Sequence, residues 1–377
     1  MVCACIATGA CRDRGATAPS PDPAPAANEA TAAGSAGTTE PSPAPPAPPA
    51  IAATEPVRIT GEAGAMGTHL AYAAYTTPRV DEAAVRRAFD AATDEIRRLE
   101  ALMTTWRPDS DLSRVNAAAG RSAVQVDPET YAVVAEALHT SEISEGTFDI
   151  TFEGLHGLWK FDEDIDPHPP TAARVKAKLP LVNWHHVHLD AAERSIRLDA
   201  PGVKISLGGI AKGYAVDRAA KLLESRGIES FFVQAGGDLY TRGKKPDGTD
   251  WQAGVRDPRG PEGSYFAMLA VSDHAFSTAG DYERSYVVNG KRYHHIIDPR
   301  TGFPATASRS VTIWAKSAFL ADAIDDAVFI LGPEKGMQLV ESIDGVGAVI
   351  VDAKNNLWVS KRLAGKLRVI SPPTDGI

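Results

Sequence analysis

The sequence predicts a mixed fold of the α+β or α/β class. Helical hydrophobic patterns occur early in the chain, and short runs with the composition of β-strands alternate with helices further along. A chain of 377 residues, 44% hydrophobic and 23% charged, can bury one full core or the cores of two subdomains. We expect the folded domain over residues 57–370 and a short polar tail over residues 371–377.

Two helices are predicted in the first part of this domain. Apolar residues recur at helical spacing over residues 80–103, and a second helix is expected over residues 129–144. The segment between them, TTWRPDSDLSRVN at residues 104–116, is dense in polar side chains. We therefore expect an exposed loop there.

Several strands are predicted in the second half. Strand-like runs occupy residues 231–233, 267–271, 311–314 and 348–351. The run YVVNGKRYHHII predicts a hairpin, because Asn-Gly between apolar segments is a strong hairpin signal. His294 and His295 would then point to opposite faces of the return strand, so at most one easily reaches a given site. For an isolated pair, one packed and one solvated histidine is the simpler interpretation.

The run KISLGGIAKGYAVDRAAKLLESRG, residues 204–227, reads as a strand-like segment entering Gly208-Gly209, followed by a helix that ends before Gly227. Glycine at such a turn lets a ligand approach the backbone, and a helix N-terminus attracts anions. Lys212 adds a full positive charge in the first turn. A tight turn with a surface lysine explains the same pattern equally well.

The run SAFLADAIDDAVFILG predicts a helix over residues 317–332, with Ser317 as N-cap and Gly332-Pro333 closing it. Asp322 and Asp326 fall on the same helical face as two phenylalanines. A pair of inward-facing carboxylates is costly unless a cation or donors satisfy it, and oxygen ligands one turn apart suit Mg²⁺. Asp325 is explained by the helix dipole.

The first 56 residues differ from the rest. Residues 1–15, MVCACIATGACRDRG, hold all three cysteines and resemble a lipoprotein signal with Cys11 as the lipidated residue. Residues 16–56 are rich in Ala and Pro and cannot bury enough apolar surface to order, which predicts a flexible tether. A disordered cytosolic tail is the alternative. No apolar stretch approaches the ~20 residues that span a bilayer.

The charge pattern narrows the class of partner. A formal net charge of -9 argues against a nucleic-acid-binding surface. An anion-accepting helix N-terminus, a hard-cation site and an imidazole near an acid together suggest phosphoryl chemistry.

Eight motifs then reveal a resemblance. They are MGTHLAYAAY, DSDLSRVN, GTFDITFEGLHGLW, LGGIAKGYAVD, QAGGDL, STAGDYER, YHHIIDPRTGFPA and SVTIWA, which lie between residues 63 and 351. Their order resembles that in ApbE-type FAD:protein FMN transferases. The resemblance implies a two-part, T-fold-like α+β body with FAD in the cleft. It also implies Mg²⁺-dependent transfer of FMN from FAD to a threonine of a target flavoprotein, with release of AMP.

The resemblance assigns roles to particular residues. His295 would be the catalytic base, an imidazole titrating near neutrality, and Asp298 would orient it or cap the turn, whereas His294 would be dispensable. Mg²⁺ would be bound by Asp322, Asp326 and the carbonyl of Gly209. The FAD site would be lined by Met66, Trp106, Thr147, Phe148, Asp149, Ser206 and Lys212.

Two departures from the family pattern bear on this assignment. Asp326 stands where the family usually has a metal-binding threonine, and Ser206 stands where it usually has an acid. Because one carboxylate is lost and another gained, we interpret the pair as compensation. A metal-dependent FAD pyrophosphatase and a non-catalytic FAD-binding lipoprotein are the alternative functions.

The resemblance also predicts the surroundings. We expect the protein on the periplasmic side of the inner membrane, where a lipid on Cys11 could anchor it. A membrane-linked flavoprotein is the expected acceptor.

Overall fold

The computed structural model describes residues 55–161 and 165–376. The expected signal segment, Cys11 and all but the last two residues of the expected tether lie outside the described residues. The described residues belong to one compact unit. No helix in this part of the chain is long and apolar enough to cross a membrane.

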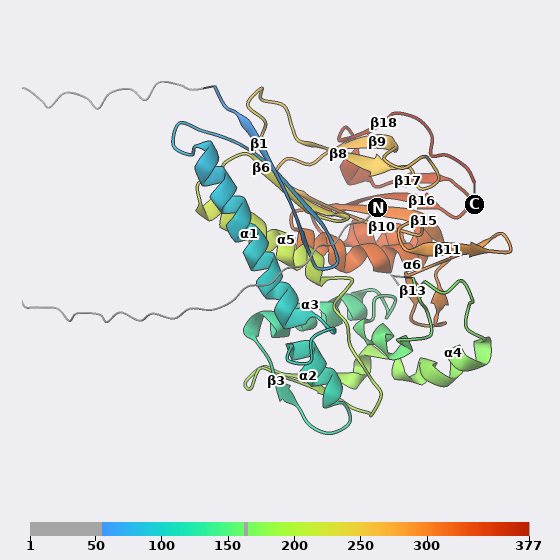
Figure 1. The fold of residues 1–377 in the computed structure, drawn as a ribbon. Coiled ribbons are helices and arrows are strands. Elements are labelled where there is room, and N and C mark those ends of the chain that lie inside the picture. The colour runs from blue at the N-terminus through green and yellow to red at the C-terminus, as the bar shows by residue number, and fades with distance from the viewer. Residues whose placement is uncertain (1–54, 162–164, 377) are drawn as a thin grey trace, which may run out of the picture. The chain divides into compact units, whose positions relative to one another are not determined.

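The centre of the fold is an eight-stranded antiparallel sheet, and three helices cover one of its faces (Figure 1). In spatial order its strands are β1 (Arg58–Ala65), β2 (Thr68–Tyr75), β6 (Phe231–Ala235), β7 (Asp238–Arg242), β10 (Ala275–Gly280), β15 (Ser308–Ala315), β16 (Gly347–Asp352) and β17 (Leu357–Val359). The covering helices are α1 (Glu82–Met103), α5 (Ala211–Ser225) and α6 (Ala318–Ser342).

Alternation along the strands builds two cores. In β15, Val311 and Ile313 belong to the core under the helices, whereas Trp314 packs with Phe266 in the second core. The second core lies against a three-stranded sheet of β8 (Gln252–Arg256), β9 (Tyr265–Ala270) and β18 (Leu367–Val369). The main sheet therefore lies between a helical layer and a smaller sheet.

The remaining elements form a second part of the same unit, drawn below the main sheet in Figure 1. It contains α2 (Asp111–Ala117), α3 (Pro128–Ile143), α4 (Ala172–Lys178) and the sheet of β3 (Val124–Gln125), β5 (Ser195–Leu198) and β4 (Val187–Asp190). Short 3₁₀ helices join these elements at η1 (Ile150–Leu155), η2 (Leu179–Leu181) and η3 (Trp184–His186), and η4 (Lys361–Leu363) follows β17.

Two small hairpins complete the fold. The first pairs β11 (Ser285–Val288) with β12 (Lys291–His294), and the second pairs β13 (Ile297–Asp298) with β14 (Phe303–Pro304). Asn289 and Gly290 have φ values of 51° and 75° in the first turn, as a two-residue hairpin of type I′ requires. The predicted hairpin, the mixed fold class, the early helices and the four strand runs are thus confirmed.

Three local predictions were wrong or incomplete. Residues 104–116 are not all loop, because Ser110 accepts the N–H of Ser113 at 3.1 Å and caps α2. The strand expected before Gly208 is absent from the described fold: the backbone N–H of Ile205 bonds to the side chain of Asn116 instead of a neighbouring strand. Gly332 leaves helical geometry at a φ of 77°, but a second helical segment continues to Ser342.

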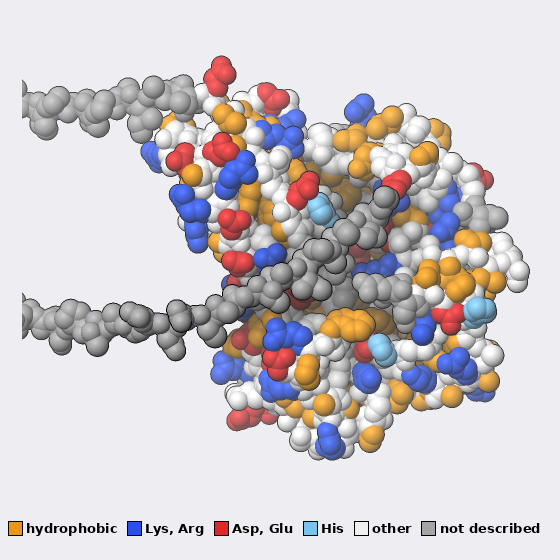
Figure 2. Space-filling view, viewed as in Figure 1, with side chains coloured by type: hydrophobic (Ala, Val, Ile, Leu, Met, Phe, Trp, Pro, Cys, Tyr) orange, Lys and Arg blue, Asp and Glu red, His pale blue; other side chains and the backbone are white. Residues whose placement is uncertain are grey.

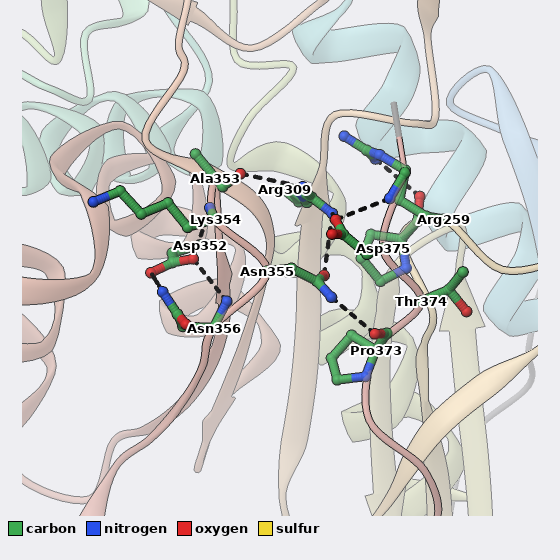
Figure 3. Close-up of polar contacts among 12 residues, drawn as sticks. Arg259, Arg309, Asp352, Ala353, Lys354, Asn355, Asn356, Pro373, Thr374 and Asp375 are labelled. Carbon is green, nitrogen blue, oxygen red and sulfur yellow. Dashed lines mark hydrogen bonds and ion pairs between the residues drawn. The ribbon is translucent and has the colours of Figure 1, made fainter.

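The C-terminal tail is attached to the body as far as Asp375, whose carboxylate bonds to Arg309 (Figure 3). Thr374 donates its hydroxyl to Asp257 at 2.6 Å, Asp375 pairs with Arg309 at 3.0 Å, and Asn355 donates to the carbonyl of Pro373 at 2.9 Å. Residues 373–375 are therefore paired with the domain through hydrogen bonds.

On the face drawn in Figure 2, acidic and basic side chains of the described residues are interspersed, and no extended basic patch is visible.

Candidate active site

The predicted cation site lies where α5 and α6 cross. A Cβ at Gly213 would lie 2.2 Å from the carbonyl oxygen of Ala318, so only glycine permits this close approach. Asp217 accepts the backbone N–H groups of Ala318 and Phe319 at 2.8 and 3.1 Å, which fixes the start of α6 against α5. The orientation of the α6 carboxylates is thereby determined by two helices.

Three carboxylates meet at this crossing. Oxygen atoms of Asp238, Asp322 and Asp325 lie within 4.8 Å of one another, and all three residues are buried. Nζ of Lys212 lies 3.0 Å from Oδ2 of Asp238 and 3.1 Å from Oδ1 of Asp322. The backbone N–H of Gly213 donates to Oδ2 of Asp322 at 2.7 Å. We call Asp238, Asp322, Asp325, Asp326 and Lys212 the acid cluster.

The charges of the acid cluster are unbalanced. Burial and the neighbouring Asp238 raise the pKa of Asp322 to about 7. Burial raises the pKa of Asp326 to about 6, although Lys212 opposes the rise. Burial by itself disfavours the charge of Lys212, but the attraction of Asp238 and Asp322 prevails and raises its pKa. Because four carboxyl groups surround a single ammonium group, the cluster favours the binding of a further cation.

Ser277 on β10 joins two of these acids. Its hydroxyl oxygen lies 2.6 Å from Oδ1 of Asp238 and 2.6 Å from Oδ2 of Asp325. A hydroxyl carries one proton, so the second contact requires a proton on one of the two carboxyls. This agrees with the pKa of Asp325, which burial and Asp326 raise well above its ordinary value.

The predicted metal ligands fit a hard cation. Oδ2 of Asp326 lies 3.0 Å from the position that a Cβ would take at Gly209, so this carboxylate lies against the Gly209 backbone. Asp322 is one helical turn earlier, inside the acid cluster. Two carboxylates and a carbonyl are the oxygen donors that Mg²⁺ prefers. The hydroxyl of Ser206 accepts the N–H of Gly208 at 3.3 Å, next to the same turn.

The two histidines have different surroundings. His294 is buried, with Nε2 2.8 Å from the carbonyl oxygen of Ala305 and its ring edge-on to Phe329, so it has a structural role. His295 follows β12 and donates its backbone N–H to the carbonyl of Arg284 at 3.1 Å. Its Nδ1 is buried and has no hydrogen-bond partner within the described residues. Neither histidine is the solvated one expected of an isolated pair.

The imidazole of His295 does not titrate near neutrality. Burial, followed by the charges of Arg284, His294 and Lys212, lowers its pKa to about 3. The ring is therefore neutral at physiological pH.

The carboxylate of Asp298 forms its hydrogen bonds within its own turn. Its carboxylate accepts from Nε and Nη2 of Arg300 at 2.9 and 2.8 Å, and from the backbone N–H of Arg300 at 2.9 Å. None of the hydrogen bonds found among residues 55–161 and 165–376 joins it to His295. Of the two predicted roles, the geometry favours capping the turn.

Two of the predicted FAD-site residues are accessible. Trp106 is 83% exposed and offers a free indole face. Met66 forms the β1–β2 turn with Gly67, at φ values of 53° and 65°. This turn adjoins Gly236, whose N–H donates to the carbonyl of His69 at 3.0 Å, and β7 with Asp238 follows directly. Met66 is therefore placed beside the acid cluster's end of the sheet.

Three others are buried and have internal partners. Thr147 donates its hydroxyl to the carbonyl of Ser144 at 2.9 Å. Asp149 accepts the backbone N–H of Trp184 at 2.8 Å and caps η1. Phe148 lies 3.4 Å from the Cβ position of Gly209 and so supports that turn. A direct contact of these three with FAD stays a prediction.

The sequence model of the ApbE family matches residues 66–350 of this chain. The chain belongs to the ApbE family. A protein named FAD:protein FMN transferase from Treponema pallidum (strain Nichols) is 33% identical over 304 residues, covering 76% of this chain and 83% of the relative. Its namesake from Vibrio cholerae serotype O1 is 34% identical over 242 residues, covering 64% and 72%.

Solved structures of ApbE proteins share the fold. The crystal structure of the ApbE protein from Thermotoga maritima has a TM-score of 0.74 and 32% identity, and covers 83% of this chain and 100% of that chain. The flavin transferase ApbE from Vibrio cholerae has a TM-score of 0.74 and 27% identity, with 82% and 99% coverage.

Sequence reasoning missed two members of the acid cluster in this ApbE-family protein. Asp238 lies inside the motif QAGGDL but received no role, because a lone acid after a glycine turn has no local signal. Asp325 was assigned to the helix dipole, yet it is 4% exposed and contacts Ser277. Its burial between α6 and β10 is a better explanation.

Proposed function

We propose that this protein transfers FMN from FAD to a threonine hydroxyl of a target flavoprotein, in a Mg²⁺-dependent reaction that releases AMP. As a member of the ApbE family with relatives named FAD:protein FMN transferase, it is a flavin transferase that takes FAD as substrate and a flavoprotein as acceptor. The finer proposal is supported by one observation above all: the buried carboxylates of Asp238, Asp322 and Asp325 meet beside the ammonium group of Lys212.

The metal part of the proposal rests on the donor set. Asp322, Asp326 and the carbonyl of Gly209 would hold Mg²⁺, which supplies charge neutralisation for the pyrophosphate and for the departing phosphate. Lys212, already held between Asp238 and Asp322, provides a fixed positive charge beside that position. Fixed charges of this kind stabilise the transition state without having to reorganise.

The proton and bond changes balance around His295. The threonine oxygen forms a bond to the phosphorus of the FMN half of FAD, and the bond from that phosphorus to the oxygen shared with AMP breaks. AMP leaves with the electron pair. The proton of the threonine hydroxyl moves to an imidazole nitrogen of His295, which is neutral and can accept it.

For localisation, we propose attachment at the periplasmic side of the inner membrane through a lipid on Cys11. The composition of residues 1–56 supports this proposal. Mass spectrometry of the protein isolated from membranes would test it, since a lipidated N-terminal peptide beginning at Cys11 is the expected product.

The activity is tested by incubating the purified protein with FAD, Mg²⁺ and an acceptor protein bearing an exposed threonine, followed by mass spectrometry. The expected products are a covalent FMN adduct on threonine and one AMP per adduct. Free FMN and AMP without adduct would replace the proposal with a pyrophosphatase. Intact FAD bound at one per chain would indicate a binding protein.

A further inference from the structure

His295 lies between two hairpins, and one side chain contacts both of them. The β11–β12 hairpin ends at His294, and the β13–β14 hairpin begins at Ile297. Trp159, in the loop after η1, packs on the first hairpin and is hydrogen-bonded to the second. It is half-buried and belongs to neither the acid cluster nor the predicted FAD site.

The contact with the first hairpin is a closed ring of four stacked aromatics. The ring of Trp159 lies 5.9 Å from that of Tyr293 and 5.8 Å from that of Phe161. Phe161 lies 5.3 Å from Tyr286, and Tyr286 lies 5.5 Å from Tyr293, its partner across the hairpin. Aromatic packing therefore holds both strands that precede His295. Each stacked pair contributes stabilisation beyond that of the apolar area it buries.

The contact with the second hairpin is a hydrogen bond and an edge contact. Nε1 of Trp159 donates to the carbonyl of Gly302 at 3.0 Å, and the indole meets Phe303 edge-on at 5.7 Å. Gly302 has a φ of 74°, and a Cβ there would lie 2.5 Å from Val175, so the turn is pressed against a small core. The β13–β14 hairpin is therefore held tightly against Trp159 and this small core.

The His295 ring needs such support. Its Nδ1 has no hydrogen-bond partner in the described parts of the chain, and Asp298 is bound to Arg300. The position of the imidazole is then fixed by its backbone, through the bond from its N–H to Arg284 and through the two flanking hairpins. A change of the hairpin angle moves the ring directly.

We propose that Trp159 is a positioning residue for His295, holding the two flanking hairpins at the angle that aims the imidazole at the acceptor hydroxyl. This inference rests on the proposed FMN transfer. Displacing a catalytic group by about 1 Å can cost roughly 100-fold in rate. The role predicts a loss in kcat, because none of the ring contacts and hydrogen bonds found for Trp159 among the described residues reaches a predicted FAD ligand or the acid cluster.

The test compares four variants of the full chain. Trp159→Leu removes both contacts, Trp159→Phe keeps a stacking ring but loses the N–H donor, and Phe161→Leu weakens only the first hairpin's ring. Trp358→Leu is the matched control, since Trp358 is half-buried on β17 and donates Nε1–H to Asp352 at 3.1 Å outside both hairpins.

Four quantities are measured for each variant: kcat and KM for FMN transfer, the thermal midpoint, and the rate at which diethylpyrocarbonate modifies His295. The modification rate is read from peptide fragment masses that separate His295 from the adjacent His294. Trp159→Leu should lower kcat roughly 10- to 100-fold with little change in the KM for FAD. Phe161→Leu and Trp159→Phe should lie between it and wild type. His295 should be modified faster in Trp159→Leu than in Trp358→Leu.

Other outcomes overturn the inference. The inference is wrong if Trp159→Leu folds and has the kcat and the modification rate of wild type. It is also wrong if kcat falls by the same factor in Trp159→Leu and in Trp358→Leu. If Trp159→Leu fails to fold, the two milder variants decide by the same criteria. If wild type forms no FMN adduct, the proposed function fails, and the modification rates still show whether Trp159 holds His295 in place.

Discussion

The acid cluster and the His295 segment are built on opposite physical principles. In the acid cluster, Lys212, Asp322 and Asp238 each have a charged or hydrogen-bonding partner, and the geometry follows from those pairs. At His295 the buried Nδ1 has no hydrogen-bond partner in the described residues, and packing of aromatic side chains holds the neighbouring backbone. Changes in the first region should alter cation affinity and pH dependence, whereas changes in the second should alter the chemical step.

The largest effect is expected for His295→Ala. A positioned general base contributes roughly 10²- to 10⁴-fold, so FMN transfer should fall by that factor. FAD binding, measured by flavin fluorescence titration, should persist because the proposed ligands of the substrate's charged groups, Lys212 and the metal-binding acids, are unchanged. Loss of FAD binding in the folded variant would instead assign His295 to the substrate site.

The next effect is on stability, from Lys212→Ala. Removing one partner from a buried ion pair typically costs about 3–5 kcal/mol, because the remaining charges lose their compensation. The free energy of unfolding in urea, measured without Mg²⁺ at pH 8, should fall by an amount of this order and recover partly when Mg²⁺ is added. Lys221→Ala, an exposed site on the same helix, is the control and should change little.

The acid cluster also predicts a pH-dependent response to Mg²⁺. In the metal-free protein the pKa values of Asp322 and Asp326 are about 7 and about 6, so at pH 5.5 both carboxyls largely hold protons that a metal must displace. The rise in melting temperature on adding Mg²⁺ should therefore be larger at pH 8 than at pH 5.5. An equal rise at both pH values would show that these carboxyls do not bind the metal.

The same raised pKa values have a consequence without metal. Between the unfolded values and pH 7, Asp322 and Asp326 bind more protons in the folded than in the unfolded state, so their contribution to stability is lost as the pH rises through about 6 and about 7. His295 acts in the opposite sense, because its pKa of about 3 in the folded state lies below its pKa in the unfolded state. Its contribution to stability grows as the pH rises from about 3 toward the unfolded pKa. Urea unfolding of Asp326→Asn should show a smaller loss of stability between pH 4 and pH 6 than wild type, because only the contribution of Asp326 is removed.

The smallest effect should come from Asp298→Ala. Because its carboxylate is bound to the half-exposed Arg300, its removal should cost about 1 kcal/mol or less and leave most of kcat intact. Steady-state transfer kinetics test this directly. A loss as large as that of His295→Ala would mean that Asp298 orients the imidazole after all and that the two regions share a polar network.

Much of the local structure followed from the sequence. Residues 80–103 and the hairpin at Asn289-Gly290 were predictable, because helical periodicity and turn chemistry depend on neighbouring residues. The ordered motifs identified the family, and the spacing of Asp322 and Asp326 indicated an oxygen-rich cation site. In contrast, α2 was missed because its few apolar residues meet a core built by distant segments.

The sequence by itself determined which residue types are present, their helical and strand periods, and the motifs of the ApbE family. Only the tertiary structure brought Asp238 and Asp325 to Ser277, and enclosed Nδ1 of His295 in surroundings that lower the pKa of this residue to about 3. The physical reason is that periodicity is a property of adjacent residues, whereas pairing, burial and pKa depend on groups from elements far apart in the chain.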